Sequence, residues 1–394
     1  MKDNEDMALR IYGRSSVSEY LGDFMVYRSL NPCDPRLPGY AECSLAAGVP
    51  SGRLPRKHED GYARLVVHLL KAARCLGDPA ARLKRLIYLG DTRLSDATAF
   101  RNLCLAGGWD GLAFICSEDS RRPPTLRLEE REVQGEGVHR LYNANRWALL
   151  SELETQRQSV GFPVDEETVV VVDLDKTAIG ARGRNAQVID QARQHAVQVT
   201  VADVLGKAFD ESVFQEAYNA LNQPEFHNFT EDNQDYLAYV CLAIGSGRYG
   251  LEGVMAKIRS GELVTFEQFI AGVDVYRLEL PVGFGDLHTD FYACMRAGDP
   301  TPFKAFRRSE YRLTASRMGS LPDGAPLAQI LAEEIVITQE VQQAGLEWKA
   351  RGALIFGLSD KPDEASLPDK VQASQGWLPL HRLETHAVGT IEGR

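Results

Sequence analysis

The apolar positions between residues 61 and 116 predict two helices that alternate with two strands. Apolar residues recur at helical spacing over about 61–76 and 95–106, and the second stretch ends at a pair of glycines. The runs 86–89 and 111–116 are short, continuously apolar and bounded by turn residues, which is typical of buried strands. Helices and strands in alternation indicate a parallel α/β sheet.

The rest of the chain gives a less even pattern. Four consecutive valines at 169–172 predict a central strand that is covered on both faces, and residues 353–358 predict another strand. We expect helices over about 142–159 and 327–349. Residues 118–140 are rich in charge and predict no regular element.

These patterns divide the chain into an α/β core, with a Rossmann-like parallel sheet, and a mainly helical insertion. The last four residues, Ile391 to Arg394, match a protease-cleavage linker and are left out of the expected fold. The expected parts are an N-terminal segment of unassigned role (1–56), the first part of the core (57–165), the valine strand with its following turn (166–180), the helical insertion (181–345) and the last part of the core (346–390).

The composition is that of a soluble globular protein, with 44% hydrophobic and 25% charged residues. The formal net charge of -11 argues against nucleic acid as a partner, because phosphate backbones are bound through clustered Lys and Arg. The seven cysteines are widely spaced and form no CxxC pair, so we expect reduced thiols and a cytoplasmic location. We see no secretory segment and no apolar run that could span a bilayer, and we expect no membrane partner.

The valine strand delivers two carboxylates to its C-terminal end. Side chains alternate along an extended segment, so Asp173 and Asp175 start on one side of the strand and Leu174 on the other. Two carboxylates this close repel each other, and they are tolerated when a hard cation sits between them and an anionic substrate, or when one is protonated. A strand that runs into an acidic surface turn is the alternative. The valines and Thr177 favour a site for phosphoryl chemistry.

Two other apolar runs also end in polar residues suited to this chemistry. Asp91 and Asp96 follow the run 86–89, and Ser359 and Lys361 follow the last apolar run. In open parallel sheets, sites form outside the carboxyl ends of the strands. We therefore expect the three strands to be neighbours and their polar side chains to converge.

These residues resemble the motifs of the haloacid dehalogenase-like (HAD) superfamily of aspartate-nucleophile phosphohydrolases. Asp173-Leu-Asp-Lys-Thr177 is similar to the first motif of the family, Ser359 to the second and Gly90-Asp-x4-Asp96 to the fourth. In the family the fourth motif follows the others. Here it precedes the first by about eighty residues, which resembles a circular permutation of the domain. The resemblance covers about half of the chain, namely 57–116, 166–180 and 346–366.

The resemblance implies a role for each of these side chains. Asp173 would be the nucleophile that forms an aspartyl-phosphate, and Asp175 would act as general acid and then as general base. Thr177 and Ser359 would donate hydrogen bonds to the oxygens of the transferring phosphoryl group. Mg²⁺ would be held by Asp173, the backbone carbonyl of Asp175, Asp91 and, directly or through water, Asp96.

A lysine is also required, because negative charge on the transferring phosphoryl group must be offset. Lys57 lies just ahead of the first predicted helix, where the resemblance places the third motif. Lys361 is close to Ser359 in sequence, and Lys71 lies inside the helix. The sequence leaves these three open, and each is also compatible with a solvated surface charge.

The helical insertion lies between the first and second of these motifs, so we expect it to act as a cap that selects a small substrate. Lys304, Arg307 and Arg308 belong to a basic cluster in it, which would form either a solvated helix face or a site for a second anionic group. We expect a Mg²⁺-dependent phosphomonoesterase, whose substrate is the phosphate ester of a small metabolite. The alternatives are a phosphotransferase or phosphonatase on the same scaffold, and a non-catalytic protein that binds a phosphate ligand.

Overall fold

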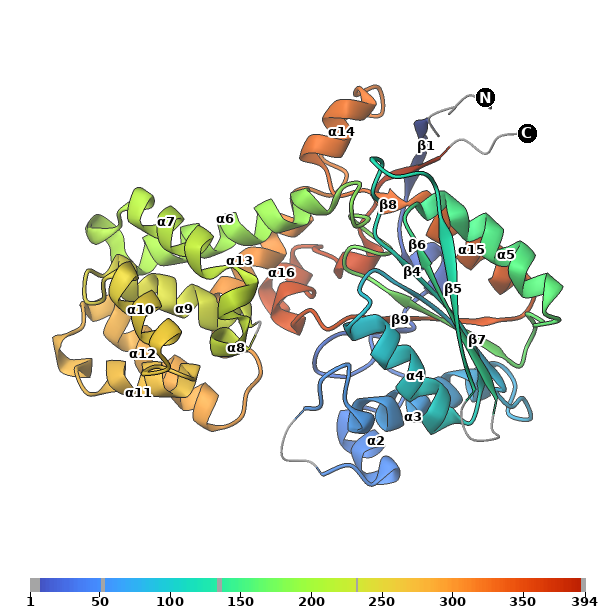
Figure 1. The fold of residues 1–394 in the computed structure, drawn as a ribbon, viewed down its shortest axis with the longest axis horizontal. Coiled ribbons are helices and arrows are strands. Elements are labelled where there is room, and N and C mark those ends of the chain that lie inside the picture. Colours follow the sequence, from blue (N-terminus) through green and yellow to red (C-terminus); the bar gives the residue numbers. More distant parts are fainter. Residues whose placement is uncertain (1–7, 51–53, 133–136, 232, 391–394) are drawn as a thin grey trace. The chain divides into compact units, whose positions relative to one another are not determined.

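The computed structural model divides the chain into two compact units (Figure 1). The first unit comprises Met1–Gln191 and Thr314–Arg394, and the second comprises Ala192–Leu313, which is an insertion in the sequence of the first. The residues that the structure describes are 8–50, 54–132, 137–231 and 233–390, so the match to a cleavage linker at 391–394 lies outside them.

Seven strands of the first unit form one sheet: β2 (Met25–Val26), β3 (Arg85–Gly90), β4 (Asp110–Cys116), β5 (Leu126–Glu132), β6 (Val138–Ala144), β7 (Thr168–Asp173) and β9 (Leu354–Leu358). Their order across the sheet is β2-β9-β7-β3-β4-β6-β5. Neighbouring strands are parallel except for β5 and β6, which are antiparallel. The expected α/β class with a mostly parallel sheet is therefore confirmed.

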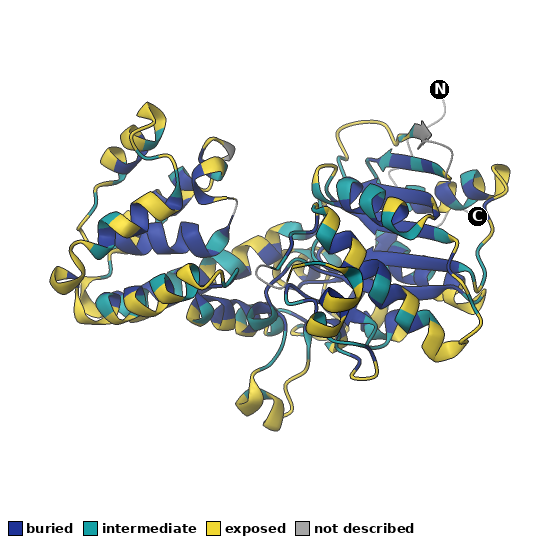
Figure 2. Cartoon of the chain, turned by 90° about the horizontal axis from the view of Figure 1, so that it is seen from below, coloured by how far each residue is buried: buried dark blue, intermediate teal, exposed yellow. Residues whose placement is uncertain are grey.

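Helices cover both faces of this sheet: α2 (Tyr40–Ala47), α3 (Asp60–Gly77), α4 (Ser95–Gly107), α5 (Leu150–Ser159) and α15 (Gln339–Ala350). α3 and α4 pack on one face, with α2 against α3, whereas α5 and α15 lie on the other face (Figure 1). Val169 and Val171 belong to the core under α3 and α4, and the alternating Val170 and Val172 point to the opposite face. Every residue of β7 is buried, as four consecutive valines predict, and Figure 2 shows the sheet strands largely buried.

A second, three-stranded sheet joins both ends of the described chain: β1 (Leu9–Ser15), β8 (Ile337–Thr338) and β10 (Thr385–Thr390). Its order is β1-β10-β8, with β1 antiparallel to β10 and β10 parallel to β8. The sequence pattern predicted none of these strands. Short helices α1 (Ser18–Leu21) and α16 (Lys370–Ser374) complete the two ends.

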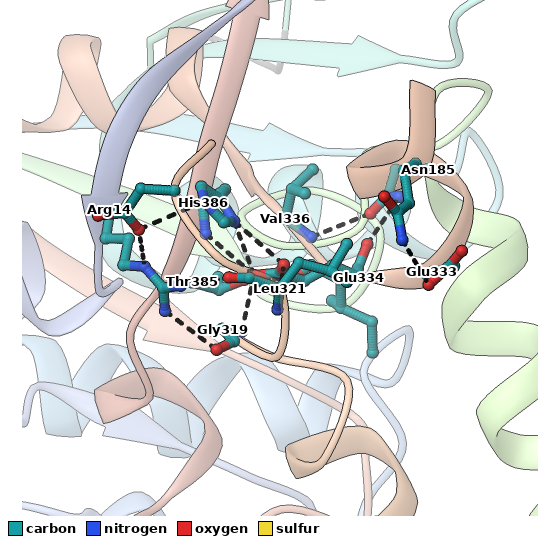
Figure 3. A network of polar contacts seen from close by, with 12 residues as sticks. Arg14, Asn185, Gly319, Leu321, Glu333, Glu334, Val336, Thr385 and His386 are labelled. Atoms are coloured by element: carbon teal, nitrogen blue, oxygen red, sulfur yellow. Dashed lines mark hydrogen bonds and ion pairs between the residues drawn. The ribbon is translucent and has the colours of Figure 1, made fainter. Parts of the chain in front are cut away.

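A buried carboxylate, Glu334, fixes the segment that leads into β8 (Figure 3). Its oxygens accept a hydrogen bond from Oγ1 of Thr385 at 2.7 Å and lie 3.0 Å from Nδ1 of His386. These contacts tie Glu334 to β10. The continuous helix expected over 327–349 is therefore wrong, because α14 (Leu327–Glu333) ends here and β8 separates it from α15.

Two predictions around β6 were also wrong. Residues 118–140, expected to be irregular, contribute β5 and the first part of β6, which form a hairpin. The helix expected from Tyr142 begins only at Leu150, after a short turn, η1 (Trp147–Leu149). β5 is the edge strand, where charged side chains are common, so its high charge hid the strand pattern.

The second unit is helical: α6 (Ala186–Leu205), α7 (Glu211–Leu221), α8 (His227–Thr230), α9 (Gln234–Gly245), α10 (Leu251–Ser260), α11 (Phe266–Asp274), α12 (Val282–Arg296) and α13 (Lys304–Ala315). α6 begins, and α13 ends, in residues of the first unit. The core is aromatic, with the ring of Tyr239 between 4.6 and 5.7 Å from those of Phe266, Phe284 and Phe291. Across the described ranges, no helix combines the length and apolar character needed to traverse a bilayer.

Candidate functional site

The carboxyl ends of β3 and β7 lie side by side, because the two strands pair in parallel with Leu89 opposite Val172. The chain leaves β3 through α4 towards β4, and it leaves β7 for β9, on the other side of β7. A crevice forms where connections diverge in this way, and ligands of open α/β sheets bind there. Asp91 directly follows β3 and Asp173 ends β7, so this switch point is acidic.

Lys57 lies between two carboxylates at this point. Its Nζ is 2.5 Å from Oδ1 of Asp173 and 2.6 Å from Oδ1 of Asp96, and only 3% of the residue is exposed. Of the three lysines considered from the sequence, Lys57 is therefore the one in contact with Asp173. Lys361 lies near a different aspartate, and Lys71 is exposed on α3.

Both oxygens of Asp96 accept hydrogen bonds. Oδ1 accepts from Lys57 and, at 3.0 Å, from the hydroxyl of Tyr88. Oδ2 accepts from the backbone and hydroxyl of Thr92, each at 2.8 Å, and from the backbone N–H of Asp91 at 3.1 Å. Asp96 therefore holds Lys57 and the turn after β3 in place.

Gly90, the last residue of β3, makes room for Asp96. A Cβ at position 90 would lie 2.7 Å from Cβ and Cγ of Asp96, closer than carbon atoms approach each other. Asp96 lies in the first turn of α4, where the helix dipole also favours a negative charge. In the motif Gly90-Asp-x4-Asp96, the first position therefore has to be glycine, because only glycine lets Asp96 pack against the end of β3.

Asp91 is paired with an arginine that the sequence patterns did not single out. Nε of Arg182 donates to Oδ2 of Asp91. Arg182 lies in the loop after β7, and its backbone N–H donates to the carbonyl of Lys176 at 2.8 Å. The glycines at 180 and 183 on either side of it have φ of 61° and 80°, a conformation that favours glycine. In the sequence, the signal for Arg182 is its position between Gly180 and Gly183, soon after the acidic end of β7.

The three aspartates at this edge, Asp91, Asp96 and Asp173, form an acidic cluster that is only partly neutralised by Lys57 and Arg182, as the raised pKa values of two of them indicate. Burial, together with Asp96 and Asp91, raises the pKa of Asp173 well above its ordinary value, although Lys57 opposes this. Burial and Asp96 raise the pKa of Asp91 to about 7, although Arg182 opposes this. Burial would lower the pKa of Lys57, but the charges of Asp173 and Asp96 outweigh it and raise that pKa. Lys57 is therefore protonated, and Asp91 and Asp173 are the carboxylates whose ionisation calls for a further cation.

The geometry of these acids fits a hard divalent cation. Asp91, Asp96 and Asp173 each offer one oxygen, and these atoms lie within 4.8 Å of one another. Donors from the described residues reach one oxygen each of Asp173 and Asp91, namely Oδ1 and Oδ2, but both oxygens of Asp96. The second oxygens of Asp173 and Asp91 are thus the candidate ligand atoms for a hard cation, which prefers carboxylate and water oxygens. Asp96 would orient the groups around it.

The segment after β9 brings a second lysine to the same edge of the sheet. β9 pairs with β7 so that Leu358 lies opposite Asp173. The strands β3, β7 and β9 are therefore neighbours, as the polar strand ends predict. Nζ of Lys361 lies 3.7 Å from Oδ1 of Asp175, and the backbone N–H of Lys361 donates to Oγ of Ser359 at 3.1 Å.

The two hydroxyls singled out from the sequence are both buried. Ser359 is 1% exposed and Thr177 is fully buried. Oγ1 of Thr177 has no hydrogen-bond partner among the residues that the structure describes. The carbonyl of Thr177 accepts from Oγ1 of Thr338 at 2.5 Å, which ties the turn after β7 to β8. A buried hydroxyl without a partner is costly, so Thr177 is suited to donate to a ligand oxygen.

The basic residues proposed from the insertion belong to the second unit, and two of them, Lys304 and Arg307, have partners within it. Arg307 is buried, and its guanidinium donates to Asp235 at 2.7 Å and to Glu310 at 2.7 Å. These ion pairs lie in the interior of the helical unit, where they neutralise the two buried acids. Lys304 pairs with Asp299 at 3.0 Å, and Arg308 is exposed.

A scan against protein-family models, a search of curated proteins and a search of solved structures found no match for this chain.

Proposed function

We propose that this protein is a Mg²⁺-dependent phosphomonoesterase of HAD-like type, with Asp173 as its nucleophile and a small phosphorylated metabolite as its substrate. The observation that carries the proposal is the buried ammonium group of Lys57 between Asp173 and Asp96, beside Asp91. Phosphoryl transfer needs a positioned nucleophile and preorganised positive charge more than it needs covalent chemistry from other groups. This site offers both, together with oxygens suited to a divalent cation.

In the first step, a carboxylate oxygen of Asp173 attacks phosphorus as the bond to the ester oxygen breaks. Asp175, half-buried two residues further on, donates a proton to the leaving alkoxide. Lys57 and Lys361 offset the charge of the phosphoryl oxygens. The Ser359 hydroxyl, whose oxygen already accepts from the backbone of Lys361, has its proton available for one of those oxygens. A bound Mg²⁺, held by Asp173 and Asp91, would supply the remaining positive charge.

In the second step, water attacks the phosphorus of the aspartyl-phosphate. Asp175, now ionised, accepts a proton from that water, so one residue serves as acid and then as base. The bond between phosphorus and the Asp173 oxygen breaks, inorganic phosphate is released and the free carboxylate returns. Lys57 enters the reaction protonated, because the charges of Asp173 and Asp96 raise its pKa. After Asp173 is phosphorylated, Asp96 and the phosphoryl oxygens keep negative charge beside it.

The helical unit Ala192–Leu313 is proposed to act as the cap. It is inserted between β7 and β9, whose carboxyl ends carry Asp173 and Ser359. An insertion that follows the nucleophile strand in the chain would control access and select the alcohol part of the ester. Among its basic residues, exposed Arg308 is better suited than buried Arg307 to contact a second anionic group of the substrate.

The test is phosphate release from a chromogenic aryl phosphate and from a panel of phosphorylated metabolites, with Mg²⁺ or with EDTA. We expect activity with Mg²⁺ only, and a loss of about a thousandfold or more in Asp173→Asn. Asp165→Asn is the matched control, since Asp165 lies at the opposite end of β7 and pairs with Arg85 at 2.5 Å. A wild-type protein that binds phosphate but hydrolyses no ester in the panel would contradict the proposal and favour a phosphate-binding protein.

A further inference from the structure

The N-terminal segment, to which the sequence patterns gave no role, extends the sheet beside the site. β2 pairs with β9, with Val26 opposite Leu358, and the backbone N–H of Ser359 donates to the carbonyl of Val26 at 3.0 Å. Because the two strands are parallel, the residues after β2 run alongside the segment after β9. Arg28 thus lies next to the loop that carries Lys361.

Arg28 contacts both of the segments that carry the lysines of the site. Its backbone N–H donates to the carbonyl of Lys361 at 3.1 Å. Its Nη1 donates to the carbonyl of Pro55 at 2.9 Å and to Oδ1 of Asp360 at 3.1 Å. Pro55 is two residues ahead of Lys57, and Asp360 adjoins Lys361. One side chain therefore joins two stretches of chain that are about 300 residues apart.

The guanidinium of Arg28 is buried, and burial of a charged group is costly unless the group has hydrogen-bond acceptors. The residue is 5% exposed, and burial lowers the pKa of its guanidinium, an effect to which nearby Arg56 adds and which Asp360 opposes. A buried guanidinium is stabilised only by the acceptors it reaches. Here those acceptors are a backbone carbonyl on one segment and a carboxylate on the other.

We propose that Arg28 is a positioning residue for phosphate binding: it holds the Lys57 and Lys361 segments in a fixed relation, so that both ammonium groups meet the same phosphoryl group. This inference rests on the proposed function, because it assumes that the two lysines bind phosphate. Nζ of Lys57 already lies against Asp173, and Nζ of Lys361 lies near Asp175. A displacement of one lysine by about 1 Å would be enough to weaken phosphate binding and hydrolysis strongly.

The test compares Arg28→Gln with a matched arginine at the opposite end of the sheet. Nη1 of Arg74 likewise joins two separate stretches of chain, since it donates to the carbonyls of Glu166 at 3.0 Å and Gly352 at 2.9 Å, which precede β7 and β9. Affinity for inorganic phosphate in the presence of Mg²⁺ is measured by calorimetry, Mg²⁺ affinity is measured alone, and thermal unfolding is recorded for each variant.

We expect Arg28→Gln to weaken phosphate binding by about tenfold or more and to leave Mg²⁺ affinity within about twofold, because the carboxylates are held by other contacts. Arg74→Gln should lower the thermal midpoint while keeping phosphate affinity. Arg28→Lys, which keeps the charge and can reach one acceptor, should restore part of the affinity. The backbone next to Arg28 has an independent tie, since the N–H and hydroxyl of Ser29 donate to Asp363 at 2.9 and 2.7 Å, so the variants should fold.

Phosphate affinity in Arg28→Gln that matches Arg74→Gln would overturn the positioning role while leaving the proposed function intact. Equal losses of phosphate and Mg²⁺ affinity would also overturn it, since they would indicate a general disturbance of the site. If Arg28→Gln does not fold, Arg28→Lys and Asp360→Asn decide the question by the same two affinities. A wild-type protein that neither binds phosphate nor hydrolyses esters would instead remove the proposed function, and the inference with it.

Discussion

Nζ of Lys57 lies 2.5 Å from Oδ1 of Asp173, although 116 residues separate the two in the chain. The contact is buried, with 4% and 8% of the two side chains exposed. A charged pair in such a place is weak support for stability by itself, but removing one partner leaves an uncompensated buried charge. The geometry of the site can therefore be tested by the free energy of unfolding, without a catalytic assay.

Lys57→Met should lower the free energy of unfolding by about 3 to 5 kcal/mol in EDTA, because two buried carboxylates, Asp96 and Asp173, then lose their ammonium partner. The same change should cost much less in an Asp173→Asn background, where one negative charge is already absent. Denaturant unfolding of the four proteins measures this coupling. Lys84→Met, which removes a solvent-exposed pair with Glu167, is the control and should leave stability almost unchanged. Additive effects of Lys57→Met and Asp173→Asn would show that the two groups do not interact in solution.

Mg²⁺ should stabilise the protein against unfolding, because the oxygens that bind it are brought together only in the folded state. At a concentration 100 times the dissociation constant the gain is about 2.7 kcal/mol. Thermal unfolding with Mg²⁺ and with EDTA measures it. The gain should vanish in Asp91→Asn and persist in Asp190→Asn, since Asp190 pairs with Lys176 in a partly exposed contact outside the acidic cluster. A wild-type protein indifferent to Mg²⁺ would argue against the metal site.

Thr177→Val should separate stability from activity. The substitution removes a buried hydroxyl that has no partner among the described residues, so stability should stay within about 1 kcal/mol of wild type or rise. Phosphate-ester hydrolysis should fall by about tenfold if the hydroxyl donates to a phosphoryl oxygen.

Thr200→Val is the contrasting control, because the Thr200 hydroxyl donates to the carbonyl of Ala196 at 2.7 Å within a helix. It should cost about 1 kcal/mol of stability and leave the mechanism unaffected. Hydrolysis unchanged in Thr177→Val would exclude the hydroxyl from the site.

Glu154 should make stability depend on acid pH. Burial opposes its ionisation, but hydrogen bonds from Arg157, Arg351 and Trp348 outweigh burial and hold its pKa well below the ordinary value of 4.5. A lowered pKa means that the ionised group stabilises the fold fully above the unfolded-state pKa, and that this contribution is lost as pH falls towards the folded-state pKa. Wild type should therefore be more stable than Glu154→Gln at neutral pH, and the difference should shrink below about pH 4.5. Urea unfolding at several pH values tests this, with tryptophan fluorescence as a probe. A difference independent of pH would contradict it.

Local patterns were enough to locate most of the elements that build the site. β3, α4, β4, β7 and β9 lie where the apolar patterns placed them, because a strand buried on both faces leaves a continuous apolar run in sequence and an amphipathic helix leaves a periodic one. β2, β8 and β10 left none, since two of them are two residues long and all three depend on pairing with distant partners. The charged hairpin strand β5 was missed because its polarity reflects an edge position.

The acidic residues at the ends of β3 and β7 were visible in the amino-acid order, because a polar residue directly after an apolar run marks a strand end and parallel strands end at one edge. The amino-acid order did not show which lysine contacts Asp173. It also did not show that Arg182 pairs with Asp91 or that Arg28 joins the two lysine segments. Those contacts depend on where loops cross and which way long side chains point. Distances set by strand order and helix packing are properties of the assembled sheet, and no local pattern of residues encodes them.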